Sequence, residues 1–310
     1  MSLALLFPGQ GTQHPEMLPW IDTQPECAAT LQRLGVALGP DWRLRLADPT
    51  WSSRNTVAQS LLTGLGIAAW QCLAPRMPAP AAIAGYSVGE LPAFWAAGVF
   101  DAATALRLAD ARALAMERSV QGLATGLLSV QGLPLKQIVA SGERVGLALA
   151  IRLGADRAVL GGLDSALDGA EAEFSAAGAR CTRLAVRLAS HTPWVASAAN
   201  DFGAQLTELV FWPPTTTLVC DLAGAALREP EALRQALAGQ IASPVLWDSC
   251  MDALAERRVT CVLEVGPGST LARLWNERHP AIPARSIDEF RSPAAVAQWV
   301  AATLAAGRGA

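Results

Sequence analysis

The stretch IAGYSVGELPAF, Ile83 to Phe94, places one aliphatic hydroxyl, that of Ser87, between two glycines, after a run of small apolar residues. The residues before Ser87 predict a buried strand, and those after it predict a helix. Pro92 falls in the first turn of that helix, where a missing N–H costs little. Small residues on both sides of Ser87 let the strand and the helix approach each other closely. The stretch therefore predicts a strand, a sharp turn and a helix, which is the basic unit of an α/β fold.

The same turn fits the G-x-S-x-G pattern of nucleophilic serines, in the strand–turn–helix context that this pattern needs. A hydroxyl at a helix N-terminus lies where backbone N–H groups and the helix dipole favour an oxyanion. Ser87 is therefore a candidate nucleophile. The alternative is a helix N-cap serine between turn glycines, and a five-residue pattern alone does not decide between the two.

Composition excludes several classes of function. The chain has 310 residues, of which 52% are hydrophobic and 16% charged, which predicts a large core with one major domain and a smaller one attached. The net charge of −3 argues against a nucleic-acid partner. No apolar run is expected to reach the length of a membrane span, and the N-terminal MSLALLFPGQGTQ is interpreted as a buried strand rather than a signal peptide.

The cysteines and histidines give no sign of a metal site. Six cysteines are scattered without a CxxC pair, and the three histidines are well separated. This usage predicts buried thiols in a reducing cytoplasm, with no disulfide framework and no metal.

Short β-like runs alternate with longer helical runs along most of the chain, which predicts a mainly parallel sheet. The expected strands are 3–7, 81–85, 215–220 and 260–266, and the clearest helices are 101–119 and 231–242. Between about 127 and 187 the order of elements becomes βαββαβ, the ferredoxin-like unit. The sequence thus predicts a larger α/β domain, 1–124 and 189–310, with an inserted ferredoxin-like domain, 125–188. A cleft between them is the expected ligand site.

A nucleophilic serine needs a general base, and His14, His191 and His279 are the only histidines. His279 lies in the polar NERHPAI and is interpreted as a surface residue. His14 follows a glycine-rich loop, but the next residue, Pro15, suggests a turn. His191, in RLASHTPWV, lies where the inserted domain returns the chain to the large one. It is the candidate base, and a structural histidine at a domain junction is the alternative.

One arginine lies on the apolar face of the predicted helix 101–119. Arg112 shares its stripe with apolar residues, whereas Arg107 and Arg118 fall mostly on the opposite side. A buried guanidinium needs an anionic partner, because burying it unpaired is costly. That partner is either an internal carboxylate, in a salt bridge, or the carboxylate of a substrate held bidentately.

Six motifs occur in order over nearly the whole chain: FPGQG, GYSVGE, the DAR that carries Arg112, the ASH that carries His191, QIASPVLW and EVGPG. In kind and spacing they resemble the malonyl-CoA:acyl carrier protein transacylase family. The resemblance implies six site residues: the nucleophile Ser87, its base His191, the oxyanion-hole amides of Gln10 and Val88, the malonyl ligand Arg112, and Gln240, whose main-chain oxygen orients His191. It also implies an α/β-hydrolase-like fold for the larger domain, malonyl-CoA as substrate, an acyl carrier protein as partner and no permanently bound cofactor.

Two positions depart from the family pattern. Tyr86 stands where the family usually has histidine, and Leu153 and Arg157 replace an asparagine-rich strand end. Tyr86 and the opening MSLALLFPGQGTQH resemble most the epsilon subunit of bacterial malonate decarboxylase, which loads malonyl onto the carrier subunit of that complex. The main interpretation is therefore that transacylase subunit. The alternatives are a transacylase of fatty-acid or polyketide synthesis, a serine hydrolase or thioesterase, and a non-catalytic subunit that docks the carrier.

Three arginines of the inserted domain, Arg152, Arg183 and Arg187, alternate with apolar residues and are expected to share one face. Such a face would suit the phosphates of CoA or an acidic carrier protein. A solvated sheet face is the alternative interpretation.

Overall fold

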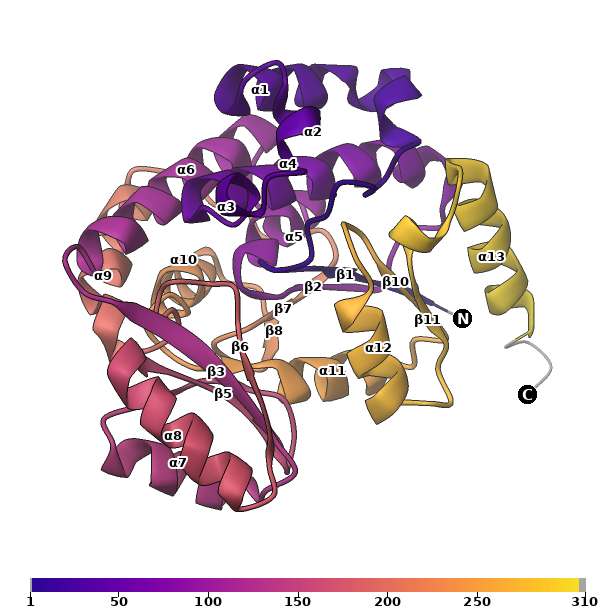
Figure 1. Ribbon diagram of the computed structural model, residues 1–310. Coiled ribbons are helices and arrows are strands. Elements are labelled where there is room, and N and C mark those ends of the chain that lie inside the picture. Colours follow the sequence, from indigo (N-terminus) through magenta and orange to yellow (C-terminus); the bar gives the residue numbers. More distant parts are fainter. Residues whose placement is uncertain (1, 307–310) are drawn as a thin grey trace.

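A six-stranded sheet forms the centre of the molecule in the computed structural model, which describes residues 2–306 (Figure 1). Its strands, in spatial order, are β11 (Ala284–Ser286), β10 (Cys261–Glu264), β1 (Leu3–Phe7), β2 (Ala82–Gly85), β7 (Thr217–Cys220) and β8 (Ala225–Leu227). All neighbouring pairs are parallel except β7 and β8. The four strands expected from the sequence all form, and the two short outer strands, β8 and β11, were not predicted.

Both faces of this sheet are buried at its centre, which explains why the central strands β1 and β2 are continuously apolar. Leu3, Leu5 and Phe7 of β1 pack into one core, and the alternate residues Ala4 and Leu6 pack into the other. The first core is completed by α1 (Ala28–Leu38), α4 (Asn55–Leu73), α5 (Glu90–Ala96), α6 (Ala102–Ser119), α9 (Ala196–Thr207), α10 (Pro230–Gly239) and α13 (Pro293–Ala306). The second core is covered by α11 (Trp247–Ala255) and α12 (Thr270–Arg278).

A second sheet lies to one side of the first, at the lower left of Figure 1. Its order is β6 (Arg180–Arg183), β3 (Thr125–Gln131), β5 (Arg157–Leu163), β4 (Ala148–Arg152) and β9 (Val245–Leu246). Two helices, α7 (Leu135–Arg144) and α8 (Asp164–Ala176), pack on it around a small core of their own. From β3 to β6 the element order is βαββαβ, as the sequence predicts. The fold is thus α/β with two sheets, the smaller one mixed.

The fifth strand of the smaller sheet comes from a distant part of the chain. β9 is only two residues long and pairs in parallel with β4, Ile151 opposite Val245. It lies within the QIASPVLW motif, between α10 and α11. The last strand of the predicted βαββαβ unit, which was expected to run to about 187, ends at Arg183, and the chain then leaves the sheet toward His191.

One helix corrects an expectation about membranes. The helical stretch Asn55–Arg76, α4 with the short turn after it, is long and apolar enough to cross a membrane by length and composition, contrary to the sequence prediction. Its most apolar window is 89% buried inside the protein, and Gln59 and Thr63 within α4 are fully buried. It packs against α1, α5 and α6, which identifies it as the central helix of a core.

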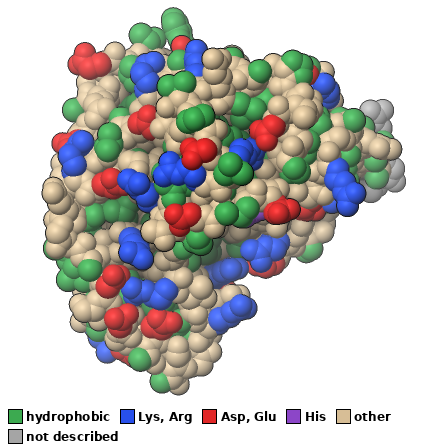
Figure 2. Space-filling view, turned by 45° about the horizontal axis from the view of Figure 1, so that its top comes forward, with side chains coloured by type: hydrophobic (Ala, Val, Ile, Leu, Met, Phe, Trp, Pro, Cys, Tyr) green, Lys and Arg blue, Asp and Glu red, His purple; other side chains and the backbone are tan. Residues whose placement is uncertain are grey.

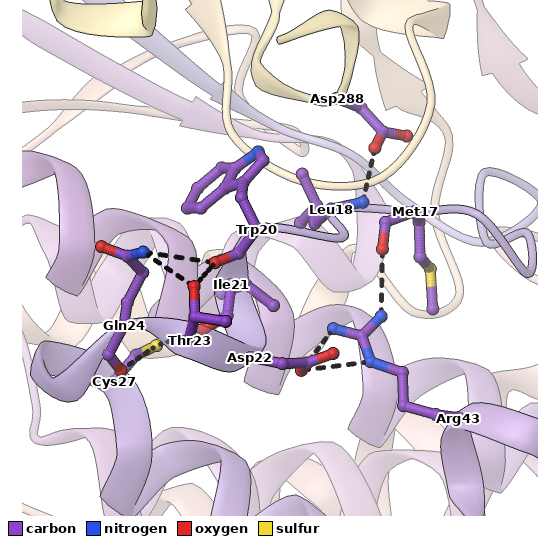
Figure 3. Close-up of polar contacts among 10 residues, drawn as sticks. All are labelled: Met17, Leu18, Trp20, Ile21, Asp22, Thr23, Gln24, Cys27, Arg43 and Asp288. Atoms are coloured by element: carbon purple, nitrogen blue, oxygen red, sulfur yellow. Dashed lines mark hydrogen bonds and ion pairs between the residues drawn. The ribbon is translucent and has the colours of Figure 1, made fainter. Parts of the chain in front are cut away.

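Hydrogen bonds to Asp288 and Arg43 hold the N-terminal segment after β1 in place (Figure 3). The Leu18 amide donates to Oδ1 of Asp288 at 2.7 Å, and Arg43 donates to the Met17 carbonyl and to Asp22. The same Asp288 accepts the Gly268 amide at 2.7 Å. These contacts anchor the segment that follows the loop carrying Gln10. Through Asp288 they also connect this segment to the loop before α12. Two short helices complete this region, α2 (Trp42–Arg45) and α3 (Pro49–Ser52).

The cysteines are all free thiols in the described residues. Five of the six are buried, and Cys181 is partly exposed. They fill the core as small apolar groups, which agrees with the expectation from their spacing.

Candidate active site

Ser87 lies on a sharp turn between β2 and α5. It begins a short 3-10 turn, Ser87–Gly89, with a backbone φ of 57°, in the left-handed region. This conformation costs a residue with a Cβ about 1–2 kcal/mol. The flanking glycines are required by close packing: a Cβ at Gly85 would lie 2.1 Å from the Gly89 oxygen, and one at Gly89 would lie 2.2 Å from the Phe7 oxygen. The small neighbours of Ser87 therefore let the strand and helix meet at a turn that holds the hydroxyl in a fixed place.

His191 reaches the Ser87 hydroxyl from the opposite wall. Its Nε2 lies 2.7 Å from Oγ of Ser87, and its Nδ1 lies 2.5 Å from the main-chain oxygen of Gln240. A carbonyl only accepts, so Nδ1 carries the proton and Nε2 is left as the acceptor that faces the hydroxyl. His191 also has a left-handed φ, 62°, and its amide donates to the Ile241 carbonyl at 2.7 Å. Two contacts with the 240–241 turn thus fix both the backbone and the ring.

Burial keeps the imidazole neutral. His191 is 1% exposed, and desolvation together with the nearby charge of Arg112 lowers its pKa from 6.5 to about 3. The hydrogen bond to Gln240 acts in the opposite direction but is the smaller effect. A neutral imidazole with a free Nε2 is the form that accepts a proton, so His191 is in the protonation state that a general base needs.

Arg112 lies in the same buried site, on the apolar face of α6. It is fully buried, and its Nη2 lies 3.4 Å from Oγ of Ser87 and 3.3 Å from Oε1 of Gln240. Its Nη1 donates to Oε1 of Gln59 at 2.8 Å, and its Nε has no hydrogen-bond partner in residues 2–306. Burial, the largest effect, lowers its pKa to about 10, and the nearby Glu90 and Asp221 act against that shift.

The internal salt bridge expected as an alternative for Arg112 does not form. No carboxylate among the described residues lies within 4.0 Å of its guanidinium nitrogens, and neutral amide oxygens hold it instead. Neutral amide oxygens do not neutralise the cation as an internal carboxylate would. The charge of Arg112 therefore remains available next to the serine hydroxyl.

Amide side chains around Arg112 were missed by the sequence analysis. Oδ1 of Asn55 accepts from Nε2 of Gln59 at 2.7 Å and from Nε2 of Gln10 at 3.2 Å, and Nδ2 of Asn55 donates to the Ala113 carbonyl. A chain of hydrogen bonds therefore runs from Arg112 through Gln59 and Asn55 to Gln10. The signal in the sequence was Asn55 and Gln59 at i and i+4 on one face of an apolar helix.

Two backbone amides beside the hydroxyl have no partner in the part of the chain that the structure describes: those of Gln10 and Val88. The amide of Ser87 itself is occupied, because it donates to Oδ2 of Asp221 at 2.6 Å. The two predicted oxyanion donors are therefore free to bind an oxygen, whereas the Ser87 amide is not.

A cavity of about 300 Å³ opens beside Ser87 and His191. One wall is the loop Gly9–Thr12, and another is α12, through Thr270, Leu271 and Leu274. The third wall is the smaller sheet, whose contributions are Leu127, Ser129, Ile151, Leu153, Arg157, Val159 and Arg183. Most of this lining is apolar, so an acyl group and its thioester would be bound away from bulk water.

The comparisons with known proteins agree with this geometry. The family model of the acyl transferase domain matches residues 4–290. The chain belongs to the acyl transferase family. The malonyl CoA-acyl carrier protein transacylase of Mycobacterium tuberculosis is 33% identical over 298 residues, which are 94% of this chain and 97% of that protein.

Two solved structures resemble this acyltransferase closely. The acyl-carrier-protein S-malonyltransferase of Burkholderia pseudomallei has a TM-score of 0.89 at 26% identity, over 97% of this chain and 99% of that one. A malonyl-transacylase solved in complex with its type II PKS acyl carrier protein has a TM-score of 0.87 at 27% identity, over 93% and 96%. The predicted family and the prediction of an acyltransferase enzyme are confirmed.

The other two histidines of the acyltransferase lie outside the cavity. Nε2 of His14 lies 2.6 Å from Oδ2 of Asp288, so His14 helps to anchor the N-terminal segment. His279 packs on Trp275 at 4.9 Å between ring centroids and lies 3.2 Å from Asp252. It is only 20% exposed in its side chain, less than the surface position expected. His191 is thus the histidine that the fold brings to the serine.

Two of the three arginines of the inserted segment are engaged in ion pairs. Arg152 is in β4 and Arg183 in β6, at opposite sides of the four contiguous strands β6-β3-β5-β4. Arg152 is paired with Asp248 at 2.8 Å and Arg183 with Asp164 at 2.7 Å, whereas Arg187 is exposed beyond the end of β6. Figure 2 shows basic and acidic side chains interspersed over the face that it presents. Because β6 ends at Arg183, Arg187 lies outside the sheet, and the strand alternation expected from the sequence does not extend to it.

No group of three or more histidine, cysteine, aspartate or glutamate side chains that could hold a metal occurs within residues 2–306.

Proposed function

We propose that this acyltransferase moves a malonyl group from CoA to the thiol of an acyl carrier protein through a malonyl-serine intermediate. One observation carries the proposal: a fully buried guanidinium without a carboxylate partner lies 3.4 Å from a serine hydroxyl that is paired with a neutral histidine. The hydroxyl and histidine are the parts of an acyl-transfer site, and the guanidinium selects an acyl group that ends in a carboxylate.

In the first half of the reaction His191 acts as general base and Ser87 as nucleophile. Nε2 of His191 takes the hydroxyl proton while Oγ of Ser87 attacks the thioester carbon. The negative oxygen that forms is bound by the amides of Gln10 and Val88, each worth roughly 3 kcal/mol of transition-state stabilisation. CoA then leaves as a thiol with the proton from His191, and malonyl-serine remains.

In the second half the thiol of the carrier replaces that of CoA. Its proton goes to Nε2 of His191, its sulfur attacks the ester, and the proton returns to Ser87 as the acyl group departs. Through both halves Gln240 holds His191 in one tautomer through its main-chain oxygen, and Arg112 holds the malonyl carboxylate. The apolar cavity keeps water from the ester, since hydrolysis would waste the intermediate.

The relatives favour a transacylase of the fatty-acid or polyketide type over the malonate decarboxylase subunit that the sequence interpretation placed first. The curated relative from Mycobacterium tuberculosis and the structure solved with a type II PKS carrier both bear malonyl transacylase names. Tyr86, which lines the cavity in place of the usual histidine, is the observation that favours the decarboxylase subunit. The latter therefore stays as the second candidate, with the carrier subunit of that complex as partner.

The proposal includes the finer architecture. The larger sheet with its helices, 1–124 and 189–310, is proposed as an α/β-hydrolase-like domain, and 125–188 as a ferredoxin-like insert. The βαββαβ order from β3 to β6 and the separate small core of that segment support this division. Malonyl-CoA is then a substrate bound between the two, with no permanently bound cofactor, and a cytoplasmic location stays a prediction.

Intact-protein mass spectrometry after mixing with malonyl-CoA tests the central step. A transferase shows a malonyl adduct that is absent in Ser87→Ala and transfers to a carrier on addition of its thiol form. A thioesterase instead releases malonate without accumulating adduct, and a docking subunit forms no adduct at all. Ser190→Ala, at a second serine that lines the cavity, is the matched control and should keep the adduct.

The choice of acceptor is tested by offering two carriers to the malonyl-enzyme. One bears ordinary phosphopantetheine and the other a dephospho-CoA-type arm. Faster discharge onto the first supports the fatty-acid or polyketide reading, and faster discharge onto the second supports the malonate decarboxylase subunit.

A further inference from the structure

Two buried carboxyl groups lie directly behind the nucleophile turn, and the reaction described above does not use them. Asp221 follows β7 and is 0% exposed, and Glu90 begins α5 and is 1% exposed. Oδ2 of Asp221 accepts the amide of Ser87 at 2.6 Å, and Oε1 of Glu90 accepts the amide of Asp221 at 2.7 Å. A chain of two hydrogen bonds therefore connects α5 to the residue after β7 and back to Ser87.

We propose that Asp221 is a positioning residue, which fixes the nucleophile turn through the Ser87 amide, and that Glu90 holds Asp221 in place. The proposal rests on the role of Ser87 as nucleophile given above. Ser87 adopts a φ of 57°, a conformation that a residue with a Cβ leaves unless other contacts hold it. A hydrogen bond from its amide to a carboxylate is such a contact, and it is the strongest kind of bond that an amide makes in a protein.

The contact also gives the neighbouring amides of Ser87 and Val88 different roles. In many serine enzymes the amide of the nucleophile itself binds the oxyanion. Here that amide points to Asp221, and the amide of the next residue, Val88, has no partner among residues 2–306. Asp221 thereby turns the peptide before Ser87 away from the reacting oxygen and leaves Val88 and Gln10 as the donors.

Burial shifts the pKa of both carboxyl groups in the same direction. Burial raises the pKa of Asp221, and the Ser87 amide and Arg112 act against that shift. Burial also raises the pKa of Glu90, and the charge of Asp221 raises it further. Tyr86, Cys220 and Cys250 are the other titratable groups nearby, and each stays neutral because burial raises its pKa. Burial is thus the largest effect on both carboxyl groups, and the Ser87 amide and Arg112 oppose it at Asp221.

The chain offers a direct probe of this hydrogen bond. It contains one tyrosine, Tyr86, and Ser87 follows it. Labelling with carbonyl-13C tyrosine and 15N serine therefore gives a single peak for the Tyr86–Ser87 peptide in a carbonyl-edited NMR spectrum. We expect this amide proton far downfield in the unmodified protein and shifted upfield in Asp221→Ala. In Asp221→Asn we expect a smaller upfield shift, because a neutral amide oxygen is a weaker acceptor.

Kinetics give the second readout. Asp221→Ala is expected to slow formation of the malonyl-serine adduct about 100-fold, the cost of a displaced nucleophile, with little change in KM for malonyl-CoA. Asp221→Asn restores most of the rate, because the acceptor oxygen is retained. Glu90→Gln, which keeps the acceptor for the Asp221 amide, should resemble Asp221→Asn.

The control is Asp288→Ala, which removes another aspartate that accepts backbone amides, those of Leu18 and Gly268. It should leave the Tyr86–Ser87 peak in place. A peak that stays in place in both Asp221 variants, or folded Asp221→Ala that forms adduct at the unmodified rate, overturns the proposal. If Asp221→Ala does not fold, an unshifted peak in Asp221→Asn overturns it. If the unmodified protein forms no adduct, the function fails, whereas the NMR result still decides the contact.

Discussion

Nη2 of Arg112 lies 3.4 Å from Oγ of Ser87, although the two residues belong to different helices of the fold. The same hydroxyl is 2.7 Å from His191, so one oxygen is shared between a base and a cation. In this resting state the guanidinium is held by neutral amides. An acyl thioester that ends in a carboxylate would bind Arg112 through that carboxylate, in place of the amides. Its thioester carbon would then lie toward Ser87.

Arg112→Ala should shift acyl preference from malonyl toward acetyl. The cation gives a dicarboxylate its binding energy and would be left unpaired by a neutral acyl group, so kcat/KM for malonyl-CoA should fall about 100-fold or more while that for acetyl-CoA rises or holds. Competition between the two thioesters measures the ratio. Arg118→Ala, on the same helix with a 57% exposed side chain, is the control. An unchanged ratio in Arg112→Ala would remove Arg112 from substrate binding.

Acylation of Ser87 should persist in mild acid. Burial holds the pKa of His191 at about 3, so the imidazole stays neutral where an ordinary histidine, with a pKa near 6.5, would be protonated. The rate of adduct formation in rapid-quench experiments should therefore be nearly constant between about pH 7 and pH 5. A decline that follows a pKa near 6.5 would show that His191 titrates normally.

The same shift affects stability. Below the unfolded pKa the unfolded chain binds a proton at His191 and the folded chain does not, so acid favours unfolding, from about pH 6.5 down to the folded pKa near 3. The loss attributable to this one group approaches about 1.4 kcal/mol per pH unit. Urea unfolding of the unmodified protein and of His191→Gln between about pH 6.5 and pH 4.5 measures it. The steeper dependence should belong to the unmodified protein, and equal slopes would contradict a neutral buried His191.

Gly85→Ala should prevent a native nucleophile turn. Its Cβ would lie 2.1 Å from the Gly89 oxygen, closer than any real contact, so the strand and α5 would have to separate. We expect a loss of several kcal/mol of unfolding free energy or no soluble protein, measured by denaturant unfolding and yield. Gly169→Ala in α8, where a Cβ meets nothing within 4 Å, should instead gain about 0.5–1 kcal/mol. Folded, active Gly85→Ala would refute the steric requirement.

Asn55→Ala should weaken the site without touching substrate. Oδ1 of Asn55 accepts from both Gln59, which holds Arg112, and Gln10, whose amide is a proposed oxyanion donor. Its removal should lower kcat/KM for malonyl-CoA about tenfold or more, because the groups it orients lose their fixed positions. The matched control is Gln71→Ala. Gln71 lies on the same helix as Asn55, and its side-chain oxygen accepts a hydrogen bond from Thr30 of α1. Equal kinetics in the two variants would show that the amide chain has no catalytic role.

Much of the fold follows from short-range patterns. The strand–turn–helix around Ser87 and the βαββαβ order after 125 were predicted because apolar runs, glycines and helical periodicity act within a few residues. The position of Arg112 was also predictable, since one cation on an apolar helix face must enter the core. The two-residue strand β9 was not, because its pairing with β4 joins residues about a hundred positions apart.

The sequence by itself determined the chemical groups: a serine between glycines, three histidines and an arginine on an apolar face. The tertiary structure alone decided which of them meet. It brought His191 rather than His14 or His279 to Ser87, replaced the expected ionic partner of Arg112 by amides, and placed Asp221 behind the Ser87 amide. Such contacts join residues far apart along the chain, and burial, which sets their charge states, is a property of the whole fold rather than of any segment.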